Sequence, residues 1–281
     1  FYKHNGETYL FNLIDTPGHV DFNYEVSRSL AACQGAVLVV DAAQGVQAQT
    51  IANFYLAFEA GLDLIPVLNK IDLPAADIPR VMKEMESTFS FLPDEILKVS
   101  AKTGLNVSQI LESVLLNVRP PTGATDRPFK GLLFDNWYDR HHGVVCLISV
   151  LDGKIKKGDV IRFLNAKKTF TVGDVGIISP DPYITGELFA GQVGFFVASI
   201  RNVTDVRVGD TIVAEADAGD ISALPGFKPA KVMVYASVFG VSGDDFDNLR
   251  AAVEKLTLND SSVTVQKESS LSLGVGFRCG F

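Results

Sequence analysis

Residues 64–72 read Leu64-Ile65-Pro66-Val67-Leu68-Asn69-Lys70-Ile71-Asp72. The apolar run that opens this segment is typical of a buried strand, and polar residues follow it at once. Apolar residues recur at helical spacing on either side, which predicts helices over residues 47–59 and 78–89. Strands that alternate with helices are the pattern of a parallel sheet. The segment therefore predicts an α/β domain with a strand at 64–69.

The same alternation extends over the first part of the chain. Further strands are predicted over residues 9–14, 36–41 and 96–100, and a further helix over 107–118. The apolar stripe of that helix predicts core packing rather than a binding face; it consists of Ile110, Leu111, Val114, Leu115 and Val118. The segment Arg119-Pro120-Pro121-Thr122-Gly123 ends the helix, because proline lacks the amide proton. We expect the first domain to cover residues 1–122.

The periodicity beyond this boundary is that of strands. The clearest runs cover residues 144–151, 160–164, 170–172 and 193–200, with glycine turns between them. An antiparallel β-barrel over residues 126–225 is the natural interpretation. Two similar turns, Lys157-Gly158-Asp159 and Val208-Gly209-Asp210, are expected to be structural.

A second break occurs at Leu224-Pro225-Gly226-Phe227-Lys228-Pro229. A strand over 231–239 follows, then an amphipathic helix that begins near Asp244 or Asp245, then alternating apolar residues over 271–277 that predict another strand. The pattern indicates the start of an α+β domain over residues 228–281, which the end of the sequence interrupts.

Bulk composition narrows the functional class. The chain has 281 residues, 47% hydrophobic composition and a net charge of −8, which argues against a broad nucleic-acid surface but allows a local basic face. No window approaches the roughly 18 to 20 apolar residues that span a bilayer. The three cysteines lie far apart, which fits a reducing compartment and indicates neither disulfides nor a zinc site.

Three short motifs follow predicted strand ends, where open α/β sheets bind ligands. In Asp15-Thr16-Pro17-Gly18-His19, the carboxylate can hold Mg²⁺ through water, and Gly18 lets an amide approach a terminal phosphate. In Asn69-Lys70-Ile71-Asp72, the Asp carboxylate can accept two hydrogen bonds from guanine, which adenine cannot offer. Ser100-Ala101-Lys102 places an amide near the guanine carbonyl. Together and in this order they indicate a guanine-nucleotide fold.

Each feature also has a plainer interpretation. Asp15-Thr16-Pro17-Gly18 alone can be a turn, and Asn69 and Asp72 can simply cap the helix that follows. His141 and His142 lie in a hairpin region without a third ligand nearby, so they are interpreted as exposed loop residues rather than metal ligands. Trp137 is interpreted as a packing residue.

Longer stretches around these motifs resemble a known group. Asp15–His19 with Val20-Asp21-Phe22 and Glu25-Val26-Ser27-Arg28-Ser29-Leu30 is similar to the translational GTPases that include elongation factors Tu and G. Residues 67–77, 119–121, 224–228 and 276–281 resemble the LepA (elongation factor four) family within that group, over essentially the whole chain. Residues 52–58 and 256–265 look more like its mitochondrial branch than the bacterial one.

The resemblance implies a P-loop-type GTPase domain, of which the N-terminal part is missing here. It implies a ribosome-dependent GTP hydrolase that acts as an elongation and fidelity factor of the tRNA back-translocation type, with GTP and Mg²⁺ as ligands. His19 would orient the attacking water and belong to the GTP-binding set, while Asp15 and Gly18 would sense the magnesium ion and the γ-phosphate.

The resemblance also implies partners and a location. The partner would be the ribosome, with its RNA and tRNA, in the mitochondrial matrix with peripheral association to the inner membrane; a bacterial-type member would be cytoplasmic.

One departure from the family bears on activity. No Gly-x-x-x-x-Gly-Lys-[Ser/Thr] phosphate loop occurs in the sequence, and the magnesium-binding threonine of the first switch is also absent. We expect the sequence to be an internal piece of a longer chain and to be inactive alone. The alternative is a module that binds the ribosome without hydrolysing nucleotide, and the sequence that precedes Phe1 would distinguish the two.

Overall fold

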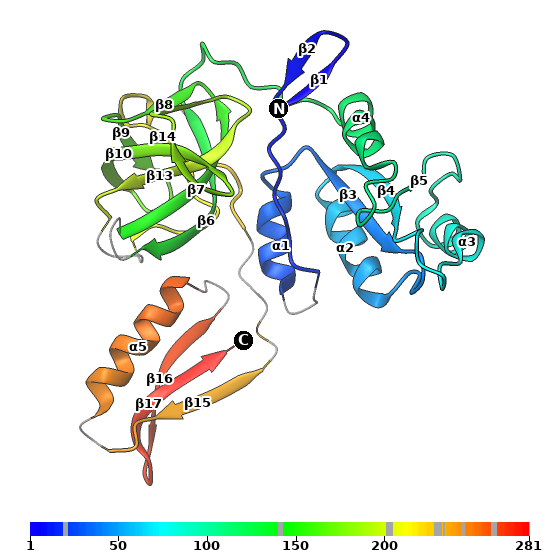
Figure 1. Ribbon diagram of the computed structural model, residues 1–281. Coiled ribbons are helices and arrows are strands. Elements are labelled where there is room, and N and C mark those ends of the chain that lie inside the picture. The colour runs from blue at the N-terminus through cyan, green and yellow to red at the C-terminus, as the bar shows by residue number, and fades with distance from the viewer. Residues whose placement is uncertain are drawn as a thin grey trace. The chain divides into compact units, whose positions relative to one another are not determined.

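The computed structural model describes residues 1–18, 22–139, 143–200, 205–227, 232, 234–242, 245–259 and 263–280 (Figure 1). The chain forms two compact units, Phe1–Pro121 and Thr122–Phe281. This division lies inside the segment 119–123. The finer division of the second unit near residues 225–228 stays a prediction.

A three-stranded parallel sheet is the centre of the first unit. The strands are β3 (Gly35–Asp41), β4 (Asp63–Asn69) and β5 (Leu97–Lys98), in that order across the sheet. The helices α2 (Ala48–Glu59), α3 (Ile78–Phe89) and α4 (Val107–Asn117) each follow one strand. The predicted α/β pattern at residues 36–118 is therefore confirmed, although β5 is shorter than the predicted strand 96–100.

Side chains of opposite parity along β4 pack against different helices. Leu68 joins a core with Phe54 of α2 and Met85 of α3. Val67 joins a second core with Val114 of α4. Strand side chains alternate between the two faces of a sheet, so helices cover both faces of β4. The expected packing role of the α4 stripe is confirmed for Ile110, Val114 and Val118, whereas Leu111 stays 40% exposed.

The predicted strand over residues 9–14 is wrong. The chain instead forms a hairpin of β1 (Tyr2–His4) and β2 (Glu7–Tyr9), and residues 10–18 adopt neither helix nor strand. Asn5 and Gly6 both have positive φ, 49° and 83°, which suits a two-residue hairpin turn. A strand at 10–14 would need a neighbouring strand to satisfy its backbone groups, and none of the sheets formed by the described residues includes this segment.

An unpredicted helix, α1 (Asn23–Leu30), follows this region. Its Val26 and Leu30 pack against Ala57 of α2. Its apolar side chains are too few for the helical period to stand out in the sequence.

The second unit contains a seven-stranded antiparallel sheet. The order is β11-β10-β13-β7-β6-β14-β9, and β9 also pairs with β10. These strands are β6 (Lys130–Asp139), β7 (Gly143–Asp152), β9 (Val160–Phe163), β10 (Lys168–Ser179), β11 (Asp181–Ile184), β13 (Val193–Ala198) and β14 (Thr211–Ala214). The β9–β10 pairing closes the sheet around a core that includes Ile148, Phe163 and Phe196. The predicted barrel is confirmed.

Smaller elements complete the barrel. A separate two-stranded sheet joins β8 (Lys154–Lys156) to β12 (Glu187–Phe189), and a 3-10 helix, η3, covers Glu215–Asp217. The predicted turns at 157–159 and 208–210 are structural, since Gly158 and Gly209 have φ of 90° and 91°. The carboxylate of buried Asp210 accepts hydrogen bonds from the amides of Asn165, Ala166 and Thr211.

The last part of the chain is an antiparallel sheet with one helix. The strands β15 (Tyr235–Phe239), β16 (Thr264–Ser270) and β17 (Gly274–Gly280) lie in the order β15-β17-β16, and Val253 of α5 (Phe246–Asn259) packs on Phe277. The predicted strand over 271–277 is partly wrong, because residues 271–273 form the turn between β16 and β17. Leu273 in that turn is exposed.

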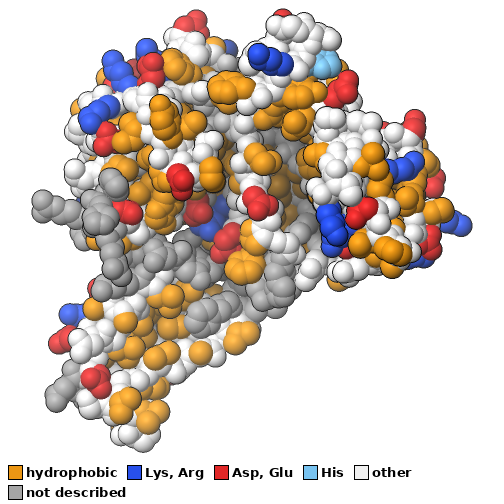
Figure 2. Space-filling view, viewed as in Figure 1, with side chains coloured by type: hydrophobic (Ala, Val, Ile, Leu, Met, Phe, Trp, Pro, Cys, Tyr) orange, Lys and Arg blue, Asp and Glu red, His pale blue; other side chains and the backbone are white. Residues whose placement is uncertain are grey.

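Several expectations concern sites rather than elements. Cys146 and Cys279 are buried and Cys33 is half-buried, all as free thiols. No helix in the described ranges is long and apolar enough to cross a membrane. Lys and Arg side chains on the face in Figure 2 are interspersed with Asp and Glu rather than gathered into one patch. His141 and His142 lie outside the described residues.

Candidate functional site

The loop after β4 begins with a residue that links two of the predicted motifs. The side-chain oxygen of Asn69 accepts hydrogen bonds from the amide of Lys70, at 2.8 Å, and from the amide of Ala101, at 3.0 Å. The following helix is capped by Asp77, whose carboxylate accepts from the amide of Arg80. Asn69 therefore braces the 100–102 loop, and the interpretation of Asn69 and Asp72 as caps of α3 is wrong.

The second link joins Asp72 to Ser100. The Ser100 hydroxyl donates to the Asp72 carboxylate at 2.6 Å and accepts from the amide of Thr103 at 3.2 Å. Ser100 is fully buried, whereas Asp72 is exposed. The hydroxyl, supported by the nearby positive charge of Lys102, lowers the pKa of Asp72 below its ordinary value. A fixed, ionised and accessible carboxylate is what recognition of a donor pair requires.

A third contact of this site involves Asp41, which the sequence analysis did not single out. Asp41 is the last residue of β3 and lies opposite Asn69 in the parallel register. Its carboxylate pairs with the Lys70 ammonium at 2.7 Å, and this contact is the main cause that lowers the pKa of Asp41. The sequence could have indicated Asp41 by its position, because Asp41 ends a strand as Asn69 does.

Among the described residues, the structure brings together two of the three motifs. Asp15, Thr16, Pro17 and Gly18 lie on the irregular segment that replaces the predicted strand, and no hydrogen bond or ion pair among the described residues connects them to the other motifs. Pro17 and Gly18 are exposed, and a Cβ at Gly18 would meet nothing within 4 Å. His19 lies outside the described residues, so its predicted catalytic role stays a prediction.

The residues present fit guanine better than they fit the rest of a nucleotide. Asp72 offers carboxylate oxygens to the two donors of the base edge, and the Ala101 loop is braced against the same strand end. For magnesium the first motif supplies one exposed carboxylate, Asp15, and the described ranges hold no cluster of three or more candidate ligands. A single carboxylate suits an ion that keeps most of its waters, as Mg²⁺ does.

Comparison with known proteins adds independent information. The family profile described as elongation factor Tu GTP binding domain matches residues 1–120, and that of elongation factor Tu domain 2 matches residues 143–213.

Individual relatives match over nearly the whole chain. The mitochondrial translation factor GUF1 homologue of Dictyostelium discoideum is 53% identical over 99% of the chain and 41% of its own length. That of Trichoplax adhaerens is 53% identical over 100% of the chain and 42% of its length, and human mitochondrial GUF1 is 49% identical with the same coverage. The chain thus spans about two fifths of the length of these relatives.

Proposed function

Because the chain belongs to the family of translational GTPases that includes LepA and the mitochondrial translation factors GUF1, we propose that the full-length protein is a ribosome-dependent GTP hydrolase. It acts as an elongation and fidelity factor of the tRNA back-translocation type. The sequence supplies the base-recognising part of the nucleotide site.

One observation carries this proposal beyond family membership. Two loops at the carboxyl ends of adjacent parallel strands are joined by the Asn69–Ala101 and Ser100–Asp72 hydrogen bonds. The joint leaves the Asp72 carboxylate exposed and ionised at the position where α/β sheets bind ligands. An oriented carboxylate favours guanine over adenine, because only guanine presents an amide and an amine side by side.

The remaining roles follow from the family resemblance. Asp15 holds magnesium through water, Gly18 places an amide near the γ-phosphate, and His19 orients the water that attacks it. Magnesium, when bound, offsets the negative charge of the β- and γ-phosphates. Thr16, Pro17, Lys70, Ile71 and Lys102 complete the GTP-binding set.

The partners and location are proposed on the same basis. The relatives are named as mitochondrial translation factors, so we place the protein in the mitochondrial matrix, in contact with ribosomal RNA and tRNA. Peripheral contact with the inner membrane belongs to the same proposal.

The alternative is a ribosome-binding module without hydrolysis. It is supported by the absence of a Gly-x-x-x-x-Gly-Lys-[Ser/Thr] loop from these 281 residues. A phosphate loop encoded upstream of Phe1 would exclude it.

Base preference provides the direct test. In the full-length protein, Asp72→Asn should weaken GTP binding by about a hundredfold, the loss expected for two hydrogen bonds to a charged acceptor. XTP binding should improve, because the new amide donates to the oxygen that replaces the guanine amine. Asp77→Asn is the matched control, since this exposed carboxylate contacts Arg80 of α3, through the helix cap and an ion pair, and no residue of the guanine motifs. Equal GTP and XTP competition profiles for Asp72→Asn and the unsubstituted protein would contradict the assignment.

A further inference from the structure

Lys70 adopts a backbone conformation that needs support. Its φ is 64°, in the left-handed region that a residue with a Cβ rarely occupies. The Asn69 side chain accepts from its amide, and the Asp41 carboxylate pairs with its ammonium at 2.7 Å. The Asp41 side chain is 18% exposed, whereas that of Lys70 is 52% exposed. The carboxylate is thus the more buried group of the pair.

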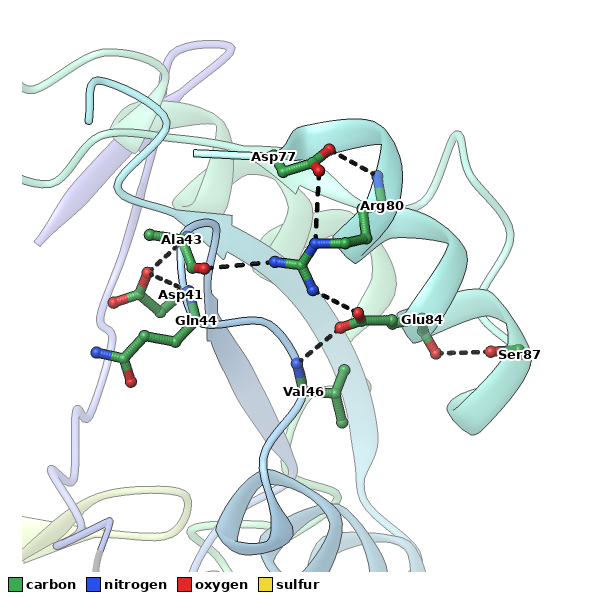
Figure 3. Close-up of polar contacts among 8 residues, drawn as sticks. All are labelled: Asp41, Ala43, Gln44, Val46, Asp77, Arg80, Glu84 and Ser87. Atoms are coloured by element: carbon green, nitrogen blue, oxygen red, sulfur yellow. Dashed lines mark hydrogen bonds and ion pairs between the residues drawn. The ribbon is translucent and has the colours of Figure 1, made fainter. Parts of the chain in front are cut away.

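Asp41 is itself held by the turn that follows β3. One of its carboxylate oxygens accepts from the amides of Ala43, at 2.8 Å, and Gln44, at 3.2 Å (Figure 3). The backbone of the turn closes as well, because the amide of Gly45 donates to the Asp41 carbonyl at 2.8 Å. The carboxylate can therefore rotate little without breaking these bonds.

Helix α3 holds this turn from the other side. Arg80 donates to the carbonyl of Ala43 at 3.3 Å, and Glu84 accepts from the amide of Val46 at 3.2 Å and from Arg80 (Figure 3). A Cβ at Gly45 would lie 2.5 Å from the Glu84 carboxylate, and Gly45 has φ of 78°. A larger residue at this position would strain the backbone and displace the Glu84 carboxylate from the turn.

The turn is also bonded to the guanine motif through its backbone. The amide of buried Ala42 donates to the Asn69 carbonyl at 2.8 Å, and the Ala42 carbonyl accepts from the amide of Asp77 at 2.9 Å. A continuous set of contacts thus runs from α3 through the 41–46 turn to Asn69 and Lys70.

We propose that Asp41 is a positioning residue of the guanine-nucleotide site, which acts by holding Lys70 in the geometry that binds nucleotide. The inference rests on the proposed function, since it concerns the same site. Because Asp41 and the turn already order Lys70, nucleotide binding does not have to offset the entropy cost of ordering this side chain. Removal of the Asp41 charge frees the Lys70 side chain and weakens binding without removing any contact to the ligand.

Asp41→Asn separates this role from a role in folding. The asparagine side-chain oxygen can still accept from the amides of Ala43 and Gln44, so the turn remains and only the negative charge is lost. Asp63→Asn is the matched control, because Asp63 starts β4 at the opposite end of the same strand and pairs with Arg119 at 2.8 Å. Asp41→Glu keeps the charge and tests for rescue.

The experiment measures GTP and GDP affinity of the full-length protein with magnesium, for Asp41→Asn, Lys70→Met and the double variant. Asp41→Asn is expected to weaken binding about three- to fivefold, the upper part of the range for a partly exposed ion pair. The double variant is expected to bind no more weakly than Lys70→Met. Asp41→Glu is expected to bind within about twofold of the unsubstituted protein. Asp63→Asn is expected to bind as the unsubstituted protein does.

Three results would overturn the inference without touching the proposed function. Additive losses in the double variant, or unchanged affinity for Asp41→Asn in a protein that binds GTP, would remove Asp41 from the site and leave the proposed function intact. If Asp41→Asn lowers thermal stability, Asp41→Glu provides the test. An Asp41→Glu variant that folds normally but binds GTP as weakly as Asp41→Asn would also contradict the inference. Absence of GTP binding by the unsubstituted protein would instead overturn the proposed function, and this inference with it.

Discussion

The Ser100 hydroxyl donates a 2.6 Å hydrogen bond to the carboxylate of Asp72, across 28 residues of sequence. Ser100 is fully buried and Asp72 is exposed. The bond therefore fixes an exposed carboxylate, which we propose recognises the base, to a buried residue of the core. It also lowers the pKa of Asp72, because a hydrogen bond to the charged form of a carboxyl favours that form.

Ser100→Ala should raise the pKa of Asp72 toward the ordinary value of about 3.9. The folded pKa lies below that value, so the bond stabilises the folded protein above pH about 4 and loses this effect as pH falls through the folded pKa. An NMR titration of the Asp72 carboxyl carbon measures the change. Guanine affinity at neutral pH should fall by about threefold to tenfold, because the carboxylate stays ionised but loses its orientation.

Ser87→Ala serves as the control for this change. The Ser87 hydroxyl donates to the backbone carbonyl of Glu84 on α3, and the residue is exposed. It should leave the Asp72 titration unmoved. An Asp72 midpoint that is the same in Ser100→Ala and in the unsubstituted protein would show that the bond is absent in solution.

His19→Ala in the full-length protein tests the proposed chemistry. GTP binding should stay nearly intact, while ribosome-stimulated hydrolysis falls by about a hundredfold or more, as expected for loss of a water-positioning group. Single-turnover hydrolysis with ribosomes measures the effect. His4→Ala in β1 is the matched histidine control. Equal rates for His19→Ala and the unsubstituted protein would remove His19 from the mechanism.

The 281-residue chain alone should hydrolyse no GTP above background and bind it far more weakly than the full-length protein. Phosphate contacts contribute a large share of nucleotide affinity, and this sequence has no phosphate loop. Calorimetry with GTP and magnesium measures the binding. Limited proteolysis of the same sample should leave residues 126–225 intact as a barrel. Micromolar affinity or repeated turnover would refute the account of the phosphate site, and rapid digestion would refute the barrel boundaries.

Local signals explain which elements the sequence predicted well. Helix α3 begins and ends at the predicted residues, 78 and 89. Asp77 caps it, Pro79 occupies its first turn, and Ser90 adopts the left-handed conformation that ends it. All of these signals lie within a few residues of the element they define.

Elements that depend on distant partners were predicted less well. The predicted strand 170–172 is the 12-residue β10, because Gly173 and Gly176 look like turn residues in sequence. In the structure a bulge lies between Val172 and Asp174, and a Cβ at Gly176 would lie 2.8 Å from the Phe195 ring. These glycines allow a bulge and a close approach within the strand rather than ending it.

The candidate site is likewise predicted only in part from the sequence. Asn69, Asp72, Ser100 and Ala101 could be named from motifs, but their mutual hydrogen bonds depend on how two loops meet in space. Asp41 belongs to no motif and was found only through its contact with Lys70. The predicted strand 9–14 is wrong because a strand is defined by its neighbours as much as by its own residues.

The closure of the barrel has a kinetic consequence. Strand β9 pairs both with β10, its neighbour in sequence, and with β14, so that Phe163 lies opposite Lys168 on one side and Ile212 on the other. The buried Asp210 carboxylate, just before β14, accepts hydrogen bonds from the amides of Asn165 and Ala166, which follow β9. The pairing of β9 with β14 and the Asp210 contacts join residues that are far apart in sequence. Their formation costs loop-closure entropy, which slows folding. A ring that is not yet closed leaves strand edges unpaired, so we expect closure to stabilise the barrel as a unit. Amide protons along β9 and β14 should accordingly exchange with solvent only through opening of the whole barrel.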